Sequence, residues 1–452
     1  MKKLLSLLCL MFVGVSVFAQ YTAIPDPNFE NALAAYDDIA NDGQVPTANI
    51  AVVTSLSVPS QNISDITGIE DFTNLEILSC GGNQLTSIDT SQNVNLLELW
   101  CYDNQLTSLD VSQNLQLTNL TCATNEITSL DVTQNILLTE LVFYYNQITN
   151  IDVSNLPELT RFFCGNNLLN SLDVSQNTLL VELIINDNQL SSLDISQNPA
   201  LINITCSYNP ISNIDVSQNP LLENITVRNT QLTSLDVSNN QNLLFLNCQV
   251  NEIADLDLSQ NLLIEDLFLY GNQLSNIDVS QNSNLEFISF GNNPLQEMDL
   301  SNNTALNKVR CVNCQNLTSL DMRNGNNTNI VTDDFDILNN PNLICISVDD
   351  VAYADVNWTS IDPQISFNVD CALGVNDAVA EVFSIYPNPT VNEFYIDTNS
   401  PIQEVIIIDS LGRVVATFNS QTSYNVSNLT VGMYFVKIKG ENSVNVKKLM
   451  IK

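Results

Sequence analysis

Hydrophobic positions along this chain recur with a period of 21 residues, from about residue 53 to residue 322. Each unit follows the pattern LxxLxCxxNxLxxLDVSQNxx, and one copy is formed by Leu96, Leu99, Cys101, Asn104, Leu106, Leu109 and Asp110. The aspartate returns at every twenty-first position from Asp89 to Asp299, and Asp321 follows one residue out of step. A unit this short cannot bury its apolar side alone, so about a dozen units are expected to stack as coils about 5 Å apart around one core.

The unit contains the same spacing twice, because LxxLxCxxN is followed by LxxLDVxxN. This nested pattern predicts two short extended segments on opposite walls of each coil, with no room for a helix. Two columns of asparagine, which begin at Asn83 and Asn93, fall at the corners of the coils. There each side-chain amide is expected to bond to backbone groups of the turn and of the adjacent coil.

These units resemble leucine-rich repeats, LxxLxLxxNxL, and are most similar to the bacterial class with 21-residue units. The resemblance covers residues 53–322 and implies a mainly β fold. The expected architecture is a right-handed solenoid whose parallel sheet lines a concave face.

Terminal segments are expected to cap this solenoid, because its end coils would otherwise expose their apolar faces. Residues 20–52 predict an N-terminal cap in which Asp26 and Pro27 begin a short helix. Residues 323–375 are expected to form a C-terminal cap and linker, with a last strand over 341–348. Trp358, Ile365 and Phe367 should cover the final coil.

Residues 376–452 differ in composition from the repeats and predict a small β-sandwich of short strands. This segment holds seven acidic and six basic residues, whereas residues 20–375 hold 43 acidic and five basic residues. The motifs at Tyr386–Pro389, Asp409–Arg413, Gly432–Phe435 and Lys447–Lys452 resemble the C-terminal sorting domain of type IX secretion substrates. The resemblance implies that residues 384–452 engage the type IX secretion machinery and are then removed.

The first 19 residues predict a secretory signal peptide, since Lys2 and Lys3 precede a short apolar run that ends at the small residue Ala19. No other stretch is apolar for about 18 residues, so no membrane span is expected. The chain should therefore be secreted or displayed on the outer cell surface.

Charge and composition exclude several classes of function. The formal net charge of −37 makes nucleic acid an unsuitable partner, because it requires a basic surface. The chain has no histidine, which removes histidine-based catalysis and histidine metal sites. We therefore expect a protein that is not an enzyme.

Seven cysteines share one column of the repeat, where other coils carry apolar residues, so we interpret them as small buried hydrophobic residues. We predict one disulfide, between Cys345 and Cys371, because export exposes both to an oxidising compartment. Aligning Leu343, Ile346 and Val348 with Leu222, Ile225 and Val227 places Cys345 on an outward position. Cys371 closes the segment expected to fold over the final coil.

The concave strands carry the candidate binding residues, because alternate side chains of a strand point outwards. Contiguous exposed aromatic residues suggest binding of a protein or a sugar ring, although strands favour aromatic residues in any case. Four of the five basic residues of the repeats also fall in concave columns. The candidate residues are Trp100, Tyr102, Tyr144, Tyr145, Arg161, Phe163 and Arg228.

Two alternatives concern carboxylates. A groove pair among Glu98, Glu140, Glu182, Asp187 and Asp266 could in principle hydrolyse glycosides. The aspartate column, represented by Asp110, Asp131 and Asp152, could bind bridging calcium, or its charges could be held by local hydrogen bonds to the serine two residues on.

We interpret the chain as a secreted or surface-attached binding protein, an adhesin or scaffold that grips a protein or glycan on its concave face. We expect no cofactor, apart from the alternative that calcium binds the aspartate column. A glycan-active surface enzyme and a structural surface protein without a ligand remain as alternatives.

Overall fold

The computed structural model describes residues 20–371, 384–398, 401–409, 412–439 and 444–452. Contacts divide the chain into two compact units, the first ending at Cys371 and the second beginning at Ala372. The predicted signal peptide, residues 1–19, lies outside the described residues. None of the helices in the described ranges has the length and apolar content that a membrane crossing requires.

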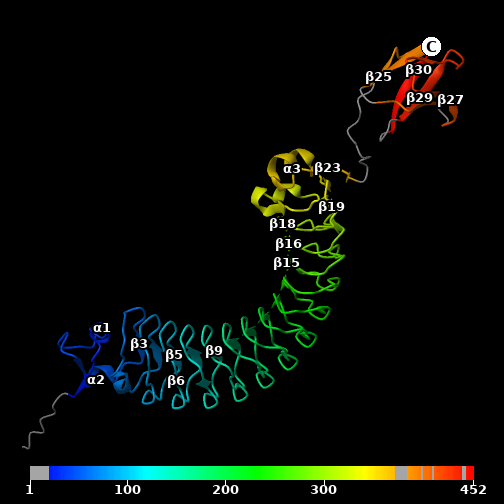
Figure 1. The fold of residues 1–452 in the computed structure, drawn as a ribbon. Helices are drawn as coiled ribbons and strands as arrows, with labels where there is room; N and C mark the ends of the chain where they lie inside the picture. The colour runs from blue at the N-terminus through cyan, green and yellow to red at the C-terminus, as the bar shows by residue number, and fades with distance from the viewer. Residues whose placement is uncertain (1–19, 372–383, 399–400, 410–411, 440–443) are drawn as a thin grey trace, which may run out of the picture. The chain divides into compact units, whose positions relative to one another are not determined.

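The first unit is a solenoid built on one parallel sheet of 15 strands, called here the long sheet (Figure 1). Its strands are β3 (Ser55–Ser57), β4 (Ile77–Ser79), β5 (Glu98–Trp100), β7 (Asn119–Thr121), β9 (Glu140–Val142), β10 (Arg161–Phe163), β11 (Glu182–Ile184), β12 (Asn203–Thr205), β13 (Asn224–Thr226), β14 (Phe245–Asn247), β15 (Asp266–Phe268), β16 (Phe287–Ser289), β18 (Lys308–Arg310), β20 (Phe335–Ile337) and β22 (Ser360–Ile361). From β4 to β18 each residue pairs with the one 21 positions away, as Arg161 does with Glu140 and Glu182. The repeat period is therefore the register of the sheet.

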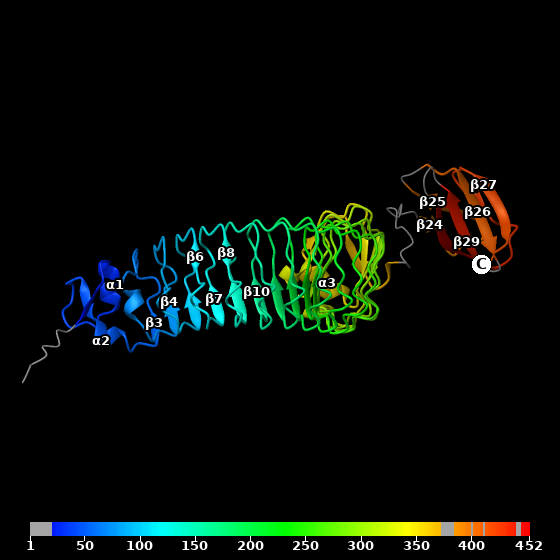
Figure 2. The same ribbon diagram turned by 90° about the horizontal axis from the view of Figure 1, so that it is seen from below.

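The opposite side of the coils, called here the second wall, is only partly a sheet. Figure 2 shows β6 and β8 on the far side of the coils from β4 and β7. The strands of the second wall are β6 (Leu109–Asp110), β8 (Leu130–Asp131), β17 (Glu297–Asp299), β19 (Ser319–Asp321), β21 (Cys345–Ser347) and β23 (Ser366–Asn368). Residues 132–296, all described, form no strand on this wall, so the prediction of two extended segments per coil holds only near the ends.

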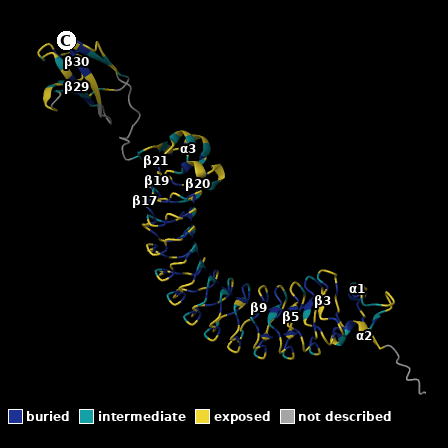
Figure 3. Cartoon of the chain, turned by 180° about the vertical axis from the view of Figure 1, so that it is seen from behind, coloured by how far each residue is buried: buried dark blue, intermediate teal, exposed yellow. Residues whose placement is uncertain are grey.

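The unpaired part of the second wall coincides with the bend of the solenoid. The coils turn most strongly between β9 and β15, and the long sheet follows the inner side of the arc while β17 and β19 lie on its outer side (Figures 1 and 3). The outer side of a bent stack must be spaced more widely than the inner side. Backbone hydrogen bonds that require strands about 4.8 Å apart are therefore kept on the inner side.

Asparagines close both corners of most coils, as predicted, and nearly all of them are buried. At the first corner, Asn188 donates from Nδ2 to the carbonyls of Cys164 (3.0 Å) and Ile185 (3.1 Å), and its Oδ1 accepts from the Leu169 N–H (2.9 Å). At the second corner, Asn198 donates to Val174 and Asn177 in the preceding coil, at 3.0 and 2.8 Å. Each amide thus joins adjacent coils through backbone groups that would otherwise be buried without partners.

The N-terminal cap contains the predicted helix α1 (Pro27–Ala32), the antiparallel pair of strands β1 (Tyr21–Ala23) and β2 (Gln44–Pro46), and the helix α2 (Thr47–Ile50). The 3-10 turn η1 (Ile69–Asp71) follows in the first coil, after β3. Asp26 caps α1, because its Oδ1 accepts from the N–H groups of Asn28 and Phe29. Its Oδ2 accepts from the N–H and hydroxyl of Ser64, each at 2.7 Å. One carboxylate therefore both begins the helix and fastens it to the first coil.

The C-terminal end corrects the sequence prediction in two respects. The long sheet continues past residue 322 through β20 and β22, so the segment expected to be only a cap holds further coils. The strand predicted over 341–348 is β21, which lies on the second wall and is followed by β22 and β23. The fading periodicity hid these coils, because η2 (Asn327–Asn329), η3 (Thr332–Asp334) and α3 (Val351–Asn357) interrupt the repeat.

Aromatic packing and a disulfide hold this end together. The ring of Trp358 is fully buried and stacks on Phe335 with centroids 4.0 Å apart. The predicted disulfide between Cys345 and Cys371 is present, with Cα atoms 5.8 Å apart. The alignment that led to it was wrong, because Cys345 belongs to the second wall and its equivalent is not Asn224 of the long sheet.

The second unit consists of two antiparallel sheets with a small core of its own. One sheet holds β24 (Ser384–Tyr386), β25 (Glu393–Asp397) and β28 (Tyr424–Asn425), and the other holds β27 (Val414–Asn419), β26 (Glu404–Asp409), β29 (Gly432–Lys439) and β30 (Val444–Ile451). The core includes Phe394, Val405, Ile407, Tyr424 and Val436, all fully buried. A small β-sandwich was predicted for this segment, and the structure shows two small antiparallel sheets.

Among the described residues, most asparagines at the second corner lack a hydrogen-bond donor for their Oδ1 atom, and this allows the role of the corner hydrogen bonds to be tested. Asn114 Oδ1 accepts from the Thr90 hydroxyl at 2.8 Å, but valine replaces that threonine in most coils, and Asn240 Oδ1 is buried without a partner in the described chain. We expect Val216→Thr, which places a hydroxyl where Thr90 has one, to change the free energy of unfolding by less than about 0.5 kcal/mol or to raise it. Val309→Thr, in the apolar core, should lower it by about 1–2 kcal/mol. Urea denaturation of both variants measures this, and equal losses would contradict the hydrogen-bond account of the ladder.

Candidate binding surface on the long sheet

The residues that flank the centre of each strand form the inner surface of the arc. The central residue, such as Leu99 or Phe162, points into the core and is fully buried, while its two neighbours point outwards. Exposure of the outward positions differs from coil to coil, so a binding site has to be located from the side chains that occupy them.

The predicted aromatic patch, defined as Trp100, Tyr102, Tyr144, Tyr145 and Phe163, lies on this surface. Trp100, Tyr102 and Tyr144 are each 39% exposed, and Tyr145 is 57% exposed. Tyr144 and Tyr145 meet edge to face, with ring centroids 5.7 Å apart. Trp100 and Tyr102 lie two coils away from this pair, across the coil of β7, so the patch consists of two groups of rings about 10 Å apart.

Small residues beneath the rings explain how the tyrosines are placed. The column that contains Tyr102 alternates between small and large residues, and its small members Gly81, Ala123, Gly165 and Ser207 are buried although they point outwards. A Cβ atom on Gly81 would lie 2.7 Å from carbons of the Tyr102 ring. The Tyr102 ring therefore packs over Gly81 of the preceding coil, where only a glycine leaves room for it, and stays partly exposed to solvent.

Two tyrosines on this surface occupy backbone positions that disfavour them. The residue before each asparagine of the first corner adopts a left-handed conformation, with φ of 54° at Tyr145 and 55° at Tyr208. Asparagine or glycine fills this position in several other coils, because bulky side chains are strained there. Thr124 and Val250 adopt the same φ of 55°, so the left-handed conformation belongs to the repeat corner, and what distinguishes Tyr145 is its exposed ring.

Arg161, predicted as a cation of the groove, has its charge compensated within the sheet. Its guanidinium lies 2.9 Å from Glu140 and 3.0 Å from Glu182, the residues directly opposite on the neighbouring strands. The hydrogen bond to Glu182 is the main cause that raises the pKa of Arg161. The same guanidinium lies 5.0 Å from the centroid of the Phe163 ring, within cation–π range.

Arg228 is not part of the aromatic patch. It follows β13, three coils beyond β10, and its guanidinium lies 5.6 Å from the ring centroid of Tyr208. The structure therefore separates two predicted site residues, Arg161 and Arg228, into different parts of the surface.

A second aromatic cluster, formed by Phe245, Phe268 and Phe287, was missed by the sequence analysis. The ring centroids of Phe245 and Phe268 are 5.2 Å apart, and those of Phe268 and Phe287 are 4.7 Å apart. Lys308 and Arg310 approach the Phe287 ring, at 5.5 and 5.9 Å from its centroid. The sequence does indicate this cluster, because Phe245 and Phe287 occupy the same repeat position as Glu98 and Arg161, two coils apart from each other.

The groove carboxylates are largely engaged in local interactions. Glu140 and Glu182 bind Arg161, and Asp187 accepts a hydrogen bond from the Asn186 amide at 2.6 Å. Burial, followed by the neighbouring charge of Glu286, raises the pKa of Asp266. Asp266 packs beside the second aromatic cluster in the sheet, opposite Phe245 and Phe287.

The aspartate column lies on the second wall, and local hydrogen bonds stabilise its charges. Asp131 Oδ1 accepts from the N–H and hydroxyl of Thr133, at 2.9 and 2.7 Å, and these bonds lower its pKa more than the neighbouring aspartates raise it. Asp152 makes the same two bonds with Ser154. This is the hydrogen-bonded alternative considered from the sequence.

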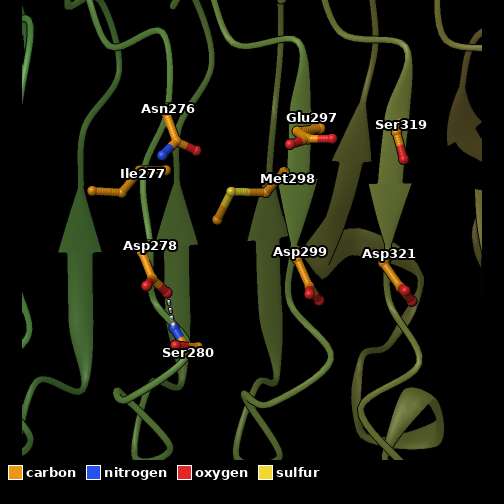
Figure 4. Close-up of a pocket in the computed structure, with 9 residues that line it drawn as sticks. All are labelled: Asn276, Ile277, Asp278, Ser280, Glu297, Met298, Asp299, Ser319 and Asp321. Atoms are coloured by element: carbon orange, nitrogen blue, oxygen red, sulfur yellow. Dashed lines mark hydrogen bonds between the residues drawn. The ribbon is translucent and has the colours of Figure 1, made fainter.

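The column also lines a cavity of about 400 Å³ on the second wall. In Figure 4, Asp278, Asp299 and Asp321 form one row and Asn276, Glu297 and Ser319 form another, with Met298 between them. Hydrogen bonds from Ser280 lower the pKa of Asp278. No group of three or more acidic, cysteine or histidine residues in the described ranges could hold a metal ion, so calcium at Asp110, Asp131 or Asp152 gains no support.

The cysteine column lies in the core, as the exchange with apolar residues predicted. Cys80, Cys101 and Cys122 follow one another in successive coils and are fully buried. Burial raises the pKa of the Cys80 and Cys122 thiols to about 12. These thiols therefore stay protonated and take no part in the surface.

Comparison with known proteins identifies both units. Residues 384–452 match the family model described as a secretion system C-terminal sorting domain. The functional domain of InlJ from Listeria monocytogenes, described as including a cysteine ladder, superposes with a TM-score of 0.59 and 25% identity over 96% of this chain and 99% of that one. The chain is a leucine-rich-repeat protein with a C-terminal secretion sorting domain.

Other relatives agree with this assignment of the repeats. A stretch of 69 residues, 15% of this chain, is 38% identical to Internalin J of Listeria monocytogenes serotype 4b, and it spans 8% of that protein's length. An internalin, InlF, from Listeria monocytogenes shares the fold with a TM-score of 0.60 and 21% identity over 76% of this chain and 96% of that one. A leucine-rich-repeat protein of Leptospira interrogans shares the fold with a TM-score of 0.51 and 19% identity, over 71% and 97% of the two chains. The leucine-rich-repeat protein is thus internalin-like in architecture, and its sorting domain directs it to secretion or the outer surface.

The hydrogen bonds of the aspartate column predict a pH dependence. Hydrogen bonds from Ser154, Ser175 and Ser196 lower the folded-state pKa of Asp152, Asp173 and Asp194. A lowered folded pKa stabilises the fold above the unfolded pKa of about 3.9, and this contribution is lost as the pH falls through the folded value. Replacing all three aspartates by asparagine should therefore lower the free energy of unfolding, relative to the parent, more at pH ~5 than at pH ~2. Denaturant titrations at several pH values measure the difference, and a difference independent of pH would rule out this account.

Proposed function

We propose that this protein is a non-enzymatic binding protein of the cell exterior, which holds a protein or glycan on the inner face of its solenoid through the aromatic patch. The observation that carries the proposal is the placement of the tyrosines. Tyr102 packs over Gly81 while 39% exposed, and Tyr145 meets Tyr144 edge to face while more than half exposed. Neither arrangement stabilises the core, and both present a ring to solvent.

The enzyme alternative has weaker support. Glycoside hydrolysis requires two free carboxyl groups at a fixed separation, one of them with a raised pKa. Glu140 and Glu182 are committed to Arg161, and Asp266, whose pKa is raised, packs beside phenylalanine rings in the sheet. The internalin-like repeat fold is typical of non-enzymatic binding proteins.

Charge provides a way to distinguish the two ligand classes. The repeats and caps carry 43 acidic and five basic residues, so a basic protein surface would be attracted over long distances and a neutral glycan would not. Binding that weakens steeply between about 50 and 300 mM salt indicates a basic protein partner. Binding that is insensitive to salt indicates stacking of a neutral sugar on the rings.

The aromatic patch predicts a graded response to substitution. Trp100→Ala or Tyr144→Ala should weaken ligand binding by about 1–3 kcal/mol, because each removes an exposed ring. Gly81→Ala keeps every ring but forces Tyr102 off the sheet, so it should weaken binding with little change in stability. Protein and glycan arrays probed with the secreted chain supply the ligand, and titration calorimetry measures the affinity.

The matched control for the patch is Gln113→Ala, an exposed change at the second corner of a coil. It should bind as the parent does. Unchanged affinity in Trp100→Ala, Tyr144→Ala and Gly81→Ala would remove the patch as the site. Loss of affinity in the control would show that binding depends on another face.

The sorting domain predicts a defect in export. Deleting residues 384–452 should leave the solenoid folded, because the two units have separate cores, but should stop the chain before it reaches the cell surface. Protease treatment of intact cells, compared with lysed cells, measures display. Surface display of the truncated chain would contradict the assigned role of these residues.

A further inference from the structure

Two cysteines in the coil of β18 face each other inside the core. Cys311 and Cys314 are both fully buried, and their sulfur atoms lie 2.7 Å apart. Cys311 belongs to the cysteine column, whose other members stand one per coil. Stacked members of that column lie about 4.8 Å apart by the spacing of the sheet, so Cys311 is distinguished by a thiol partner within its own coil.

Cys314 occupies a position that the repeat otherwise reserves for a hydrogen-bonding side chain. In the preceding coil, Asn293 donates to the carbonyls of Leu269 and Phe290, each at 3.0 Å, and its Oδ1 accepts from the Leu274 N–H. Thr230, the other exception in this column, still donates to the Val227 carbonyl at 3.0 Å. Cys314 offers only a thiol 3.6 Å from the Phe290 carbonyl.

Replacing the asparagine of the repeat by cysteine removes hydrogen bonds from this corner, so the corner is weaker unless the sulfur makes another stabilising bond. A thiol is a poor donor, and the carbonyls that an asparagine would satisfy are buried. Apolar packing alone does not explain the cysteine, because any small apolar residue could fill this position. A covalent bond to the neighbouring sulfur accounts for the choice of residue.

The next coil holds the two cysteines in place. Asn340 Oδ1 accepts from the Cys314 N–H at 2.7 Å, and Asn340 Nδ2 donates to the Cys311 carbonyl at 2.8 Å. One side chain thus clamps both ends of the four-residue turn, from Cys311 to Cys314, so that the sulfur atoms point toward each other.

We propose that Cys311 and Cys314 form a second disulfide in the exported protein, in addition to the bond between Cys345 and Cys371. The oxidant is a protein disulfide of the thioredoxin-like class in the oxidising compartment. The thiolate of one of the two cysteines attacks the disulfide of the oxidant protein and forms a mixed disulfide with it. The thiolate of the other cysteine then attacks the sulfur of the first cysteine in that mixed disulfide, and the bond to the oxidant protein breaks. The donor leaves as a dithiol with two electrons, and the two cysteines lose one proton each. Both sulfurs are buried in the finished coil, so the exchange precedes closure of the last coils.

Thiol counting on the secreted full-length chain tests the proposal. Ten cysteines follow residue 19, and the chain is denatured without reductant, alkylated and mapped by mass spectrometry. We expect six alkylated cysteines, and a peptide containing Cys311 and Cys314 that is unalkylated and lighter by two hydrogens. Eight alkylated cysteines that include both Cys311 and Cys314 would overturn the proposal, as would a bond from either of them to another cysteine.

A second measurement follows the effect of the bond on stability. In the background Cys345→Ser, Cys371→Ser, adding reductant should lower the urea midpoint, because only the proposed bond remains to be broken. Adding Cys314→Asn to that background restores the asparagine of the corner and should make the midpoint independent of reductant. A urea midpoint that does not change with reductant in the background variant would refute the proposal. If that variant does not fold, the thiol count on the parent chain tests the proposal instead.

Discussion

The buried asparagine amide is the interaction on which the rest of this structure depends. Each coil turns two corners inside the protein, and each corner leaves backbone groups without partners in their own coil. Asn188 and Asn198 satisfy these groups in their own coil and in the preceding one, so a coil is complete only when it has a neighbour. This explains why the repeat is long and regular, and why both ends need caps that supply the missing bonds. Asp26 does so at the first coil through Ser64, and Asn340 does so near the last.

The two walls respond differently to this stacking, and the difference creates the candidate binding surface. The long sheet keeps its hydrogen bonds through 15 strands, while the second wall gives up its pairing where the solenoid bends. Bending toward the long sheet makes its outward positions the inner face of an arc. A small residue, Gly81, then allows the Tyr102 ring of the neighbouring coil to pack against the sheet. Exposed aromatic faces on a rigid, hydrogen-bonded support lose little conformational entropy when a ligand binds.

Most of the fold follows from the sequence because the repeat period is also the register. The strands of the long sheet and the two corners could be predicted from it, whereas the second strand predicted for every coil forms only near the ends. The helix begun by Asp26 could be predicted from its capping residue. The coils after residue 322 could not, because insertions such as α3 break the period there, and the alignment of Cys345 failed for the same reason. On the surface, a column shows which residues share a face but not which of them interact. The pairing of Arg161 with two glutamates and the separation of Arg228 from the rings depend on side-chain reach, which a column does not contain.

The two walls of the solenoid differ in how their charges are compensated. The aspartates of the second wall are held by local N–H and hydroxyl donors, as Asp131 is by Thr133, so that wall keeps its negative charge without requiring a counter-ion. On the long sheet, by contrast, Arg161 lies between Glu140 and Glu182 and reduces the charge beside the rings of the aromatic patch. The field around the solenoid therefore attracts basic partners in general, but desolvation is least costly where charge is already compensated and ring faces are exposed. The lower desolvation cost, and not the overall field, is therefore the effect that favours the inner face of the arc as the binding surface proposed here.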